Sequence, residues 1–386
     1  MIQFIGGNQI TLLKSGNEYF PALLAAIENS HSEIYIQSYI YEMDSIGIRI
    51  GNALKDAARR GVVVNVLLDG FGSQHLSASY VNELTSVGVQ LMFYRLKISP
   101  WSFKKRRLRR LHRKVVVVDG KIGFVGGINI IDDNNVPNQA PPRIDYAVRI
   151  EGRLLPAIVA STHKLWRRIA WMQIPHQFNM TYVKSNAIFS EVKANVNAAL
   201  VLRDNILHRR DIEEAYLSAI NSAKTEIIIA NAYFVPGRKF RKALIAAADR
   251  GVEVKLLLQG RKEYVLMFAT KTFYTELLCK SIEIYEYRKS FMHSKVAVID
   301  QHWATVGSSN IDPFSLLLSR EANIVVLDSA FASELRTDII ASIHDGAYRI
   351  SSQEWTHGNI LQRFSSWLAY GVVRVFLGLI GYSNEQ

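Results

Sequence analysis

Two segments of the chain repeat one pattern of apolar and polar positions. Glu33–Gly70 begins with an apolar, β-rich run, continues with a stretch of helical periodicity and ends with the run VVVNVLL; Glu226–Gly260 has the same layout and ends with VEVKLLL. This order and spacing predict a βαβ unit with parallel strands. The nearly continuous apolar runs indicate strands that are buried on both faces.

The repeat extends beyond these two units. Lys114–Ile130 matches Lys295–Ile311, and Asp145–Gly152 matches Glu321–Asp328. The chain is therefore expected to contain two α/β domains of one design, each an α/β/α sandwich around a largely parallel central sheet.

The boundaries follow from the extent of the repeat. The first domain is placed at residues 1–178 and the second at 179–350, followed by a tail at 351–386. In Leu361–Ile380, helical spacing gathers apolar side chains on one face: Leu361, Phe364, Leu368, Val372, Val375, Phe376 and Leu379. This pattern predicts an amphipathic helix lying in a membrane interface. A helix packed on the protein's own surface is the alternative.

Composition narrows the class of protein. The chain has 386 residues, 49% of them hydrophobic and 21% charged, which is typical of a globular protein. The net charge of +12 favours an anionic partner: nucleic acid, a phospholipid surface or a phosphorylated substrate. The single cysteine, Cys279, excludes an intramolecular disulfide and a CxxC zinc site. We see neither a signal peptide nor a run of about twenty uncharged apolar residues.

A basic run precedes the valines at 115–118. Residues 104–114 contain eight Lys or Arg and no acid, and the first half carries 12 more residues than the second ahead of its histidine. The run is therefore mainly an insertion. It is expected to contact anionic lipid headgroups through Lys104, Lys105, Arg106, Arg107, Arg109 and Arg110. A solvated loop and a nucleic-acid-binding segment are the alternatives.

Both halves contain the pattern His-x-Lys followed, four residues later, by Asp. The first copy comprises His112, Lys114 and Asp119, and the second His293, Lys295 and Asp300. In a strand, side chains two residues apart share a face, so each histidine points the same way as its lysine. All six motif residues are candidates for the catalytic set, although the aspartates stand in the opposite phase, which favours a role in fixing the strand end. Small residues follow in each half and then an asparagine, Asn129 or Asn310, which can donate hydrogen bonds.

These doubled motifs resemble the HKD superfamily, which is named for phospholipase D, over almost the whole chain. The resemblance implies two halves packed with pseudo-two-fold symmetry around one active site that needs no metal and no cofactor. It implies that His112 attacks phosphorus, that His293 protonates the leaving alcohol, and that Lys114, Lys295, Asn129 and Asn310 hold the phosphoryl charge. It also implies a carboxylate further along the same half for each histidine: Asp145 for His112 and Glu321 for His293.

Three stretches resemble the bacterial cardiolipin synthases, in particular the short form without N-terminal membrane spans. They lie at residues 7–47, 109–130 and 145–152. This resemblance implies phosphatidyl transfer between two phosphatidylglycerol molecules by a peripheral protein at the cytoplasmic face of the bacterial membrane, with no nucleic acid partner. An HKD nuclease or hydrolytic phospholipase D, and a non-catalytic membrane scaffold, are the alternatives.

Overall fold

The computed structural model describes residues 2–95, 109–136, 140–173, 194–261 and 270–357, together with Gly371. In the first half the helices are α1 (Ser15–Glu28), α2 (Ser45–Arg59), α3 (Ala78–Ser86) and α5 (Leu155–Gln173). The strands there are β1 (Ile5–Lys14), β2 (Glu33–Ser38), β3 (Val63–Asp69), β4 (Gln90–Tyr94), β5 (Lys114–Val118), β6 (Ile122–Gly126), β7 (Arg143–Ile144) and β8 (Tyr146–Gly152).

The second half repeats this order. Its helices are α6 (Asp211–Ser222), α7 (Arg238–Asp249), α9 (Tyr274–Leu278), α10 (Pro313–Leu317), α11 (Ser329–Gly346) and α12 (Ser352–His357). Its strands are β9 (Val196–Arg203), β10 (Glu226–Asn231), β11 (Glu253–Gln259), β12 (Glu283–Tyr287), β13 (Phe291–Met292), β14 (Lys295–Ile299), β15 (Trp303–Gly307), β16 (Glu321–Leu327) and β17 (Ala347–Arg349).

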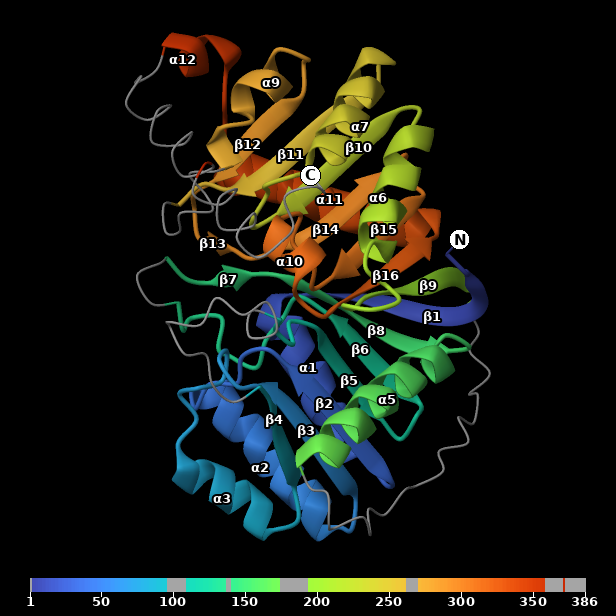
Figure 1. The fold of residues 1–386 in the computed structure, drawn as a ribbon, viewed down its shortest axis with the longest axis vertical. Coiled ribbons are helices and arrows are strands. Elements are labelled where there is room, and N and C mark those ends of the chain that lie inside the picture. The colour runs from blue at the N-terminus through green and yellow to red at the C-terminus, as the bar shows by residue number, and fades with distance from the viewer. Residues whose placement is uncertain are drawn as a thin grey trace.

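One continuous sheet runs through both halves, which are stacked along the long axis of the molecule (Figure 1). Its strand order is β17-β12-β11-β10-β14-β15-β16-β9-β1-β8-β6-β5-β2-β3-β4. The central strands β1 and β9 pair antiparallel, and from them outward the two halves repeat one strand order. This repetition confirms the predicted α/β fold with two homologous halves and gives it pseudo-two-fold symmetry.

The sheet is mixed, which corrects the expectation of largely parallel sheets. Parallel pairing holds among β2, β3 and β4 and among β10, β11 and β12, as the βαβ units predicted. The strands nearer the centre pair antiparallel. The turn between β5 and β6 is too short for a crossover, which takes a dozen or more residues, so those two strands form a hairpin.

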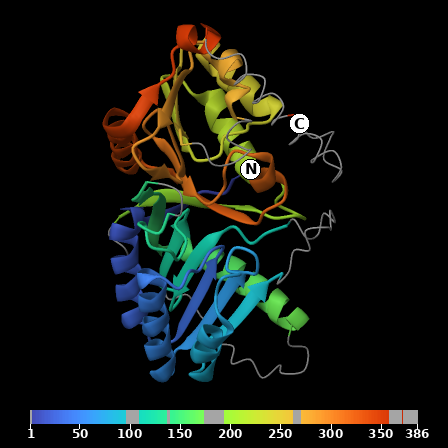
Figure 2. The same ribbon diagram turned by 90° about the vertical axis from the view of Figure 1, so that its left-hand side faces the viewer.

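Helices cover both faces of this sheet. In the first half, α1, α2 and α3 pack on one face, and in the second half α6, α7 and α9 form a comparable core. α5 and α11 contribute to a third core that extends through both halves. Figure 2 shows α1 and α2, in blue, on the opposite side of the sheet from α5, in green. Among the described residues, none of the helices has the length and apolar character needed to cross a membrane.

The two motif aspartates close turns at the far ends of their strands. Asp119 follows β5 with φ +52°, and its carboxylate accepts hydrogen bonds from the backbone N–H groups of Ser32 (2.8 Å) and Glu33 (3.0 Å). Asp300 makes the same bonds with Thr225 and Glu226. Five strand residues, or roughly 16 Å, separate each aspartate from its histidine. Both are therefore turn residues, as their phase in the strand predicted, and their inclusion in the catalytic set was wrong.

Replacing Asp119 with Ala should lower the free energy of unfolding by about 1–3 kcal/mol, because several backbone donors lose their acceptor. Activity per folded molecule should stay within a few-fold of the wild type. Urea unfolding and a lipid-product assay measure the two quantities. Asp56→Ala, which removes an exposed carboxylate on α2, is the matched control and should change stability by less than about 0.5 kcal/mol. Lost activity with unchanged stability would contradict the structural role.

Candidate active site

Each motif histidine is held by a carboxylate from the other half of the chain. Nδ1 of His112 lies 3.0 Å from the Glu321 carboxylate, and Nδ1 of His293 lies 2.7 Å from Oδ2 of Asp145. The expectation that each histidine pairs with the carboxylate of its own half was therefore wrong. The two halves are similar enough for either pairing to suit the sequence, and the topology selects the crossed one.

The backbone explains the crossing. His112 N donates to the carbonyl oxygen of Arg320 (3.0 Å), the residue before Glu321. His293 N donates to the carbonyl oxygen of Ile144 (2.8 Å), the residue before Asp145. Two further backbone contacts lie here: the short parallel pairing of β13 with β7, and an isolated bridge between Leu111 and Arg320. Each histidine thus enters its strand alongside the segment that leads into the opposite carboxylate.

The motif lysines lie beneath the histidines and are buried. Lys114 Nζ donates to the carbonyl oxygen of His112 (2.7 Å), and Lys295 Nζ donates to that of His293. Lys295 Nζ also lies 3.6 Å from Oδ2 of Asp145. Burial lowers the pKa of Lys114 to about 7 and that of Lys295 to about 8. Two neighbouring ammonium groups with unfavourable burial form a site that an anion would stabilise.

The histidine rings are neutral at neutral pH in this structure. Burial lowers the pKa of His293 to about 3, with Lys295 adding to the effect and Asp145 opposing it. Burial also lowers the pKa of His112, against the influence of Glu321. For Asp145, burial acts to raise the pKa, but Lys295 and the hydrogen bond from His293 outweigh it and lower the pKa. An ionised carboxylate accepts hydrogen bonds, so Nδ1 of His293 donates and Nε2 is left for chemistry.

Small residues allow the carboxylates to approach. A Cβ at Gly127 would lie 2.2 Å from Oδ1 of Asp145, so a larger residue there would displace the carboxylate. At the equivalent position, Ser308 Oγ donates to Oε2 of Glu321 (2.5 Å). Gly127 thus leaves room for one carboxylate, and Ser308 binds the other by a hydrogen bond.

The two predicted asparagines have different surroundings. Both are buried. Asn129 accepts a hydrogen bond from Ile40 N (3.1 Å). Asn310 Nδ2 lies 3.4 Å from Ser315 Oγ, and its buried Oδ1 has no hydrogen-bond partner among the residues that the structure describes.

Aromatic rings flank the histidines, and sequence reasoning did not assign them to the site. The Tyr39 ring centroid lies 4.8 Å from that of His112, and Lys114 Nζ lies 5.5 Å from the Tyr39 centroid. Phe291 lies 5.9 Å and Tyr233 6.3 Å from His293. For Tyr39 and Tyr233, the signal in the sequence was the aromatic turn that follows the first strand of each βαβ unit.

The structure describes the basic run only from Arg109 onward. Lys104, Lys105, Arg106 and Arg107 lie outside the described residues. Arg110 is buried, and its Nε donates to both carboxylate oxygens of Asp69 (3.0 and 3.1 Å). The assignment of Arg110 to a lipid-facing surface was therefore wrong, because its guanidinium is committed to a buried ion pair. Arg109 is half-buried.

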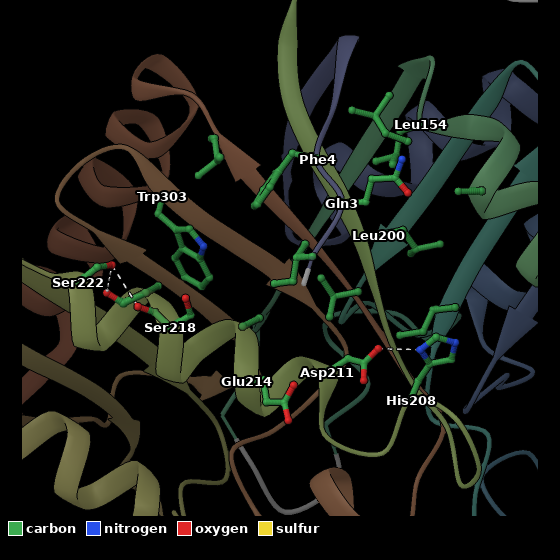
Figure 3. Close-up of a pocket in the computed structure, with 18 residues that line it drawn as sticks. Gln3, Phe4, Leu154, Leu200, His208, Asp211, Glu214, Ser218, Ser222 and Trp303 are labelled. Carbon is green, nitrogen blue, oxygen red and sulfur yellow. Dashed lines mark hydrogen bonds and ion pairs between the residues drawn. The ribbon is translucent and has the colours of Figure 1, made fainter.

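A separate cavity of about 780 Å³ lies between α6 and the N-terminal segment, with Phe4, Leu200 and Trp303 on its walls (Figure 3). None of the motif histidines, lysines or their carboxylates lines it. The carboxylate of Asp211 bonds Nδ1 of His208 (2.6 Å) at one end. The cavity is thus distinct from the site described above.

Comparison with known proteins agrees with this geometry. Residues 23–140 and 216–342 match the family model described as "Cardiolipin synthase, PLD-like domain". The chain is 36% identical over 387 aligned positions to cardiolipin synthase B of Escherichia coli K12, covering 97% of this chain and 90% of that protein. It is 37% identical to cardiolipin synthase B of Salmonella typhimurium LT2 over the same shares. The chain therefore belongs to the phospholipase D-like cardiolipin synthase family, whose members are phosphatidyltransferases.

Solved structures show the same fold at lower identity. Phosphatidylserine synthase of Haemophilus influenzae superposes with a TM-score of 0.72 at 14% identity, covering 99% of this chain and 97% of that one. Polyphosphate kinase of Porphyromonas gingivalis gives a TM-score of 0.57 over 89% of this chain.

The crossed pairing predicts which residues are energetically coupled. In double-mutant cycles of urea unfolding, Asp145→Asn and His293→Ala should show a coupling free energy of about 0.5–3 kcal/mol, because the two side chains share a buried hydrogen bond. Asp145→Asn and His112→Ala should be additive within about 0.5 kcal/mol. Glu321→Gln should be coupled to His112→Ala and additive with His293→Ala. Coupling between the pairs from the same half would refute the crossed arrangement.

Proposed function

We propose that this protein is a cardiolipin synthase that transfers the phosphatidyl group of one phosphatidylglycerol to a second and releases glycerol. The observation that carries the proposal is the crossed pair of histidines, each held through Nδ1 by a carboxylate and placed above a buried lysine. The identity to cardiolipin synthase B over nearly the full length supports the choice of lipid substrate.

In the first step, Nε2 of His112 attacks the phosphorus of the donor lipid. A nitrogen–phosphorus bond forms, the bond from phosphorus to the glycerol oxygen breaks, and His293 gives that oxygen a proton. His293 must be protonated for this step, although burial holds its pKa to about 3 in the free site. The anionic phosphodiester supplies the missing negative charge, which favours the imidazolium form. Lys114 and Lys295 stabilise the charge that develops on the phosphoryl oxygens.

In the second step, the primary hydroxyl of another phosphatidylglycerol attacks the phosphorus held on His112. His293, now neutral, accepts the proton of that hydroxyl, and the nitrogen–phosphorus bond breaks to release cardiolipin. Covalent catalysis of this kind divides one difficult displacement into two easier ones. The same histidine donates a proton and then accepts one, which suits a ring that Asp145 holds in a fixed orientation.

We further propose that the protein acts as a peripheral protein at the cytoplasmic face of the membrane. Among the described residues, the apolar loop that follows β9 is available for this contact. β9 ends at Arg203, which lies opposite Glu321 in the antiparallel pairing of β9 with β16. In this loop Ile206 is 55% and Leu207 75% exposed, while Asp204 accepts hydrogen bonds from their backbone N–H groups. A loop fixed in this way, next to the Glu321 that binds His112, enters the lipid interface while the active site faces the headgroups. The tail at 358–386 lies almost wholly outside the described residues.

Replacing either histidine by Ala should lower cardiolipin formation from phosphatidylglycerol vesicles by at least about 10²–10⁴-fold, because both steps need both rings. Mass spectrometry of the extracted lipid measures the product, and single-stranded DNA in a parallel reaction tests the nuclease alternative. His293→Asn should accumulate a phosphatidyl adduct on His112. Near wild-type cardiolipin output from His112→Ala would overturn the mechanism, and cut DNA without cardiolipin would overturn the substrate.

Replacing Ile206 and Leu207 together with Ser should weaken binding to phosphatidylglycerol vesicles at least about tenfold, since two exposed apolar side chains leave the lipid interface. Vesicle sedimentation measures the binding. The matched control is Tyr348→Ser, at an exposed aromatic residue on the edge strand β17 of the sheet, which should leave binding unchanged. Equal binding of the double variant and the wild type would exclude the loop as a membrane contact.

A further inference from the structure

A buried carboxylate at the end of β3 holds the segment that leads into His112. Asp69 is the last residue of β3 and is fully buried. Nε of Arg110 donates to both of its oxygens (3.0 and 3.1 Å), and the backbone N of Leu111 donates to Oδ2 (2.8 Å). Two backbone N–H groups of the loop that follows β3 donate to Oδ1. One carboxylate thus joins that loop to the two residues before His112.

The backbone carries this restraint to His112 and to its carboxylate. The carbonyl oxygen of Arg110 accepts a hydrogen bond from Arg320 N (2.8 Å), and the carbonyl oxygen of Arg320 accepts one from His112 N (3.0 Å). The next residue, Glu321, binds Nδ1 of His112 at 3.0 Å. Asp69 therefore fixes the backbone contact from which both members of this histidine–carboxylate pair project.

The same loop holds the aromatic ring that flanks His112. Ser73 N donates to the carbonyl oxygen of Asp69 (3.0 Å). Ser73 Oγ donates to the carbonyl oxygen of Tyr39 (3.0 Å) and accepts from the backbone N two residues further on (3.0 Å). A Cβ at Gly72 would lie 2.3 Å from the Tyr39 carbonyl oxygen, so only glycine allows this approach. Because the Tyr39 ring lies 4.8 Å from that of His112, the loop at residues 69–73 restrains this histidine from two sides.

The second half makes the equivalent contact without this ion pair. By alignment of the repeats, Gln259 at the end of β11 takes the position of Asp69, and Phe291 takes that of Arg110. Among the described residues, neither amide atom of Gln259 has a hydrogen-bond partner, although both are buried. His293 nevertheless enters its strand through the same type of backbone hydrogen bond as its counterpart. The contact between the halves therefore does not require the ion pair, which restrains only the first histidine.

We propose that Asp69 is a positioning residue for the nucleophile, which it fixes through the loop at residues 69–73. This inference rests on the proposed function, in which Nε2 of His112 attacks phosphorus. An attacking atom must lie in line with the breaking bond, and a misplacement of about 1 Å can cost on the order of 10²-fold in rate. A proton donor needs only to be within hydrogen-bond reach. The restraint is thus found beside the histidine whose ring forms the covalent bond.

The test compares Asp69→Asn and Ser73→Ala with the wild type on phosphatidylglycerol vesicles. In Asp69→Asn an amide group meets the donors of Arg110, so kcat for cardiolipin formation per folded molecule should fall about 10–100-fold. KM should stay within about threefold, because the lysines that hold the phosphate are unchanged. Ser73→Ala removes only a hydroxyl and should lower kcat about 3–10-fold, the effect of one or two hydrogen bonds. This milder variant tests the proposal even where Asp69→Asn folds poorly.

Nitrogen NMR of labelled histidine tests the positioning without substrate. Each variant should shift the ring resonances of His112 and leave those of His293 nearly unchanged. Wild-type protein that makes no cardiolipin would refute the proposed function, whereas the NMR comparison would still report whether the loop fixes His112.

Arg336→Gln is the matched control, because it breaks another two-bond ion pair, with Glu226 at the start of β10 (2.6 and 2.9 Å). It should lower the thermal unfolding temperature while leaving kcat and the resonances of both motif histidines unchanged. If Asp69→Asn and Ser73→Ala behaved like this control, Asp69 would have only a structural role and the proposal would be overturned. Equal shifts at both histidines, or a raised KM with unchanged kcat, would overturn it as well.

Discussion

The exchange of histidine–carboxylate hydrogen bonds between the two halves is the interaction on which the site depends. His112 is bonded to Glu321 and His293 to Asp145, across sequence separations of 209 and 148 residues. Neither half contains a complete site, because each supplies a histidine to one pair and a carboxylate to the other. The continuous sheet that joins β1 to β9 is what brings these groups together. The fold and the chemistry therefore rest on the same interface.

Burial gives this site its electrostatic character. Two lysines and two histidines lie close together, with Asp145 and Glu321 as their carboxylate partners. Burial lowers the pKa of Lys114 to about 7 and of Lys295 to about 8, which marks their charged forms as strained. On the proposed function, a phosphodiester bound between the histidines would relieve this strain and would allow His293 to become charged. Substrate binding and activation of the acid would then be one electrostatic event.

Local pattern was sufficient to predict the repeat, the βαβ units and the histidines and lysines that meet in the site. It was insufficient where partners are distant. Asp145 and Glu321 stand at the start of two equivalent strands, β8 and β16, so the sequence offers each histidine two equivalent carboxylates and gives no preference for either. Arg110 was interpreted as part of a basic run that contacts lipid headgroups because its partner, Asp69, lies 41 residues away at the end of β3. Asp119 shares a motif with His112, yet the length of β5 separates them.

Histidine tautomers provide the most direct test of the crossed site. Nitrogen NMR of the protein with labelled histidine, with resonances assigned from single variants, reports which ring nitrogen carries the proton. At neutral pH, His112 and His293 should both be neutral rings protonated at Nδ1, and Asp145→Asn should perturb the resonances of His293 while leaving those of His112 nearly unchanged. Rings protonated at Nε2, or a response of His112 to Asp145→Asn in place of His293, would contradict the account.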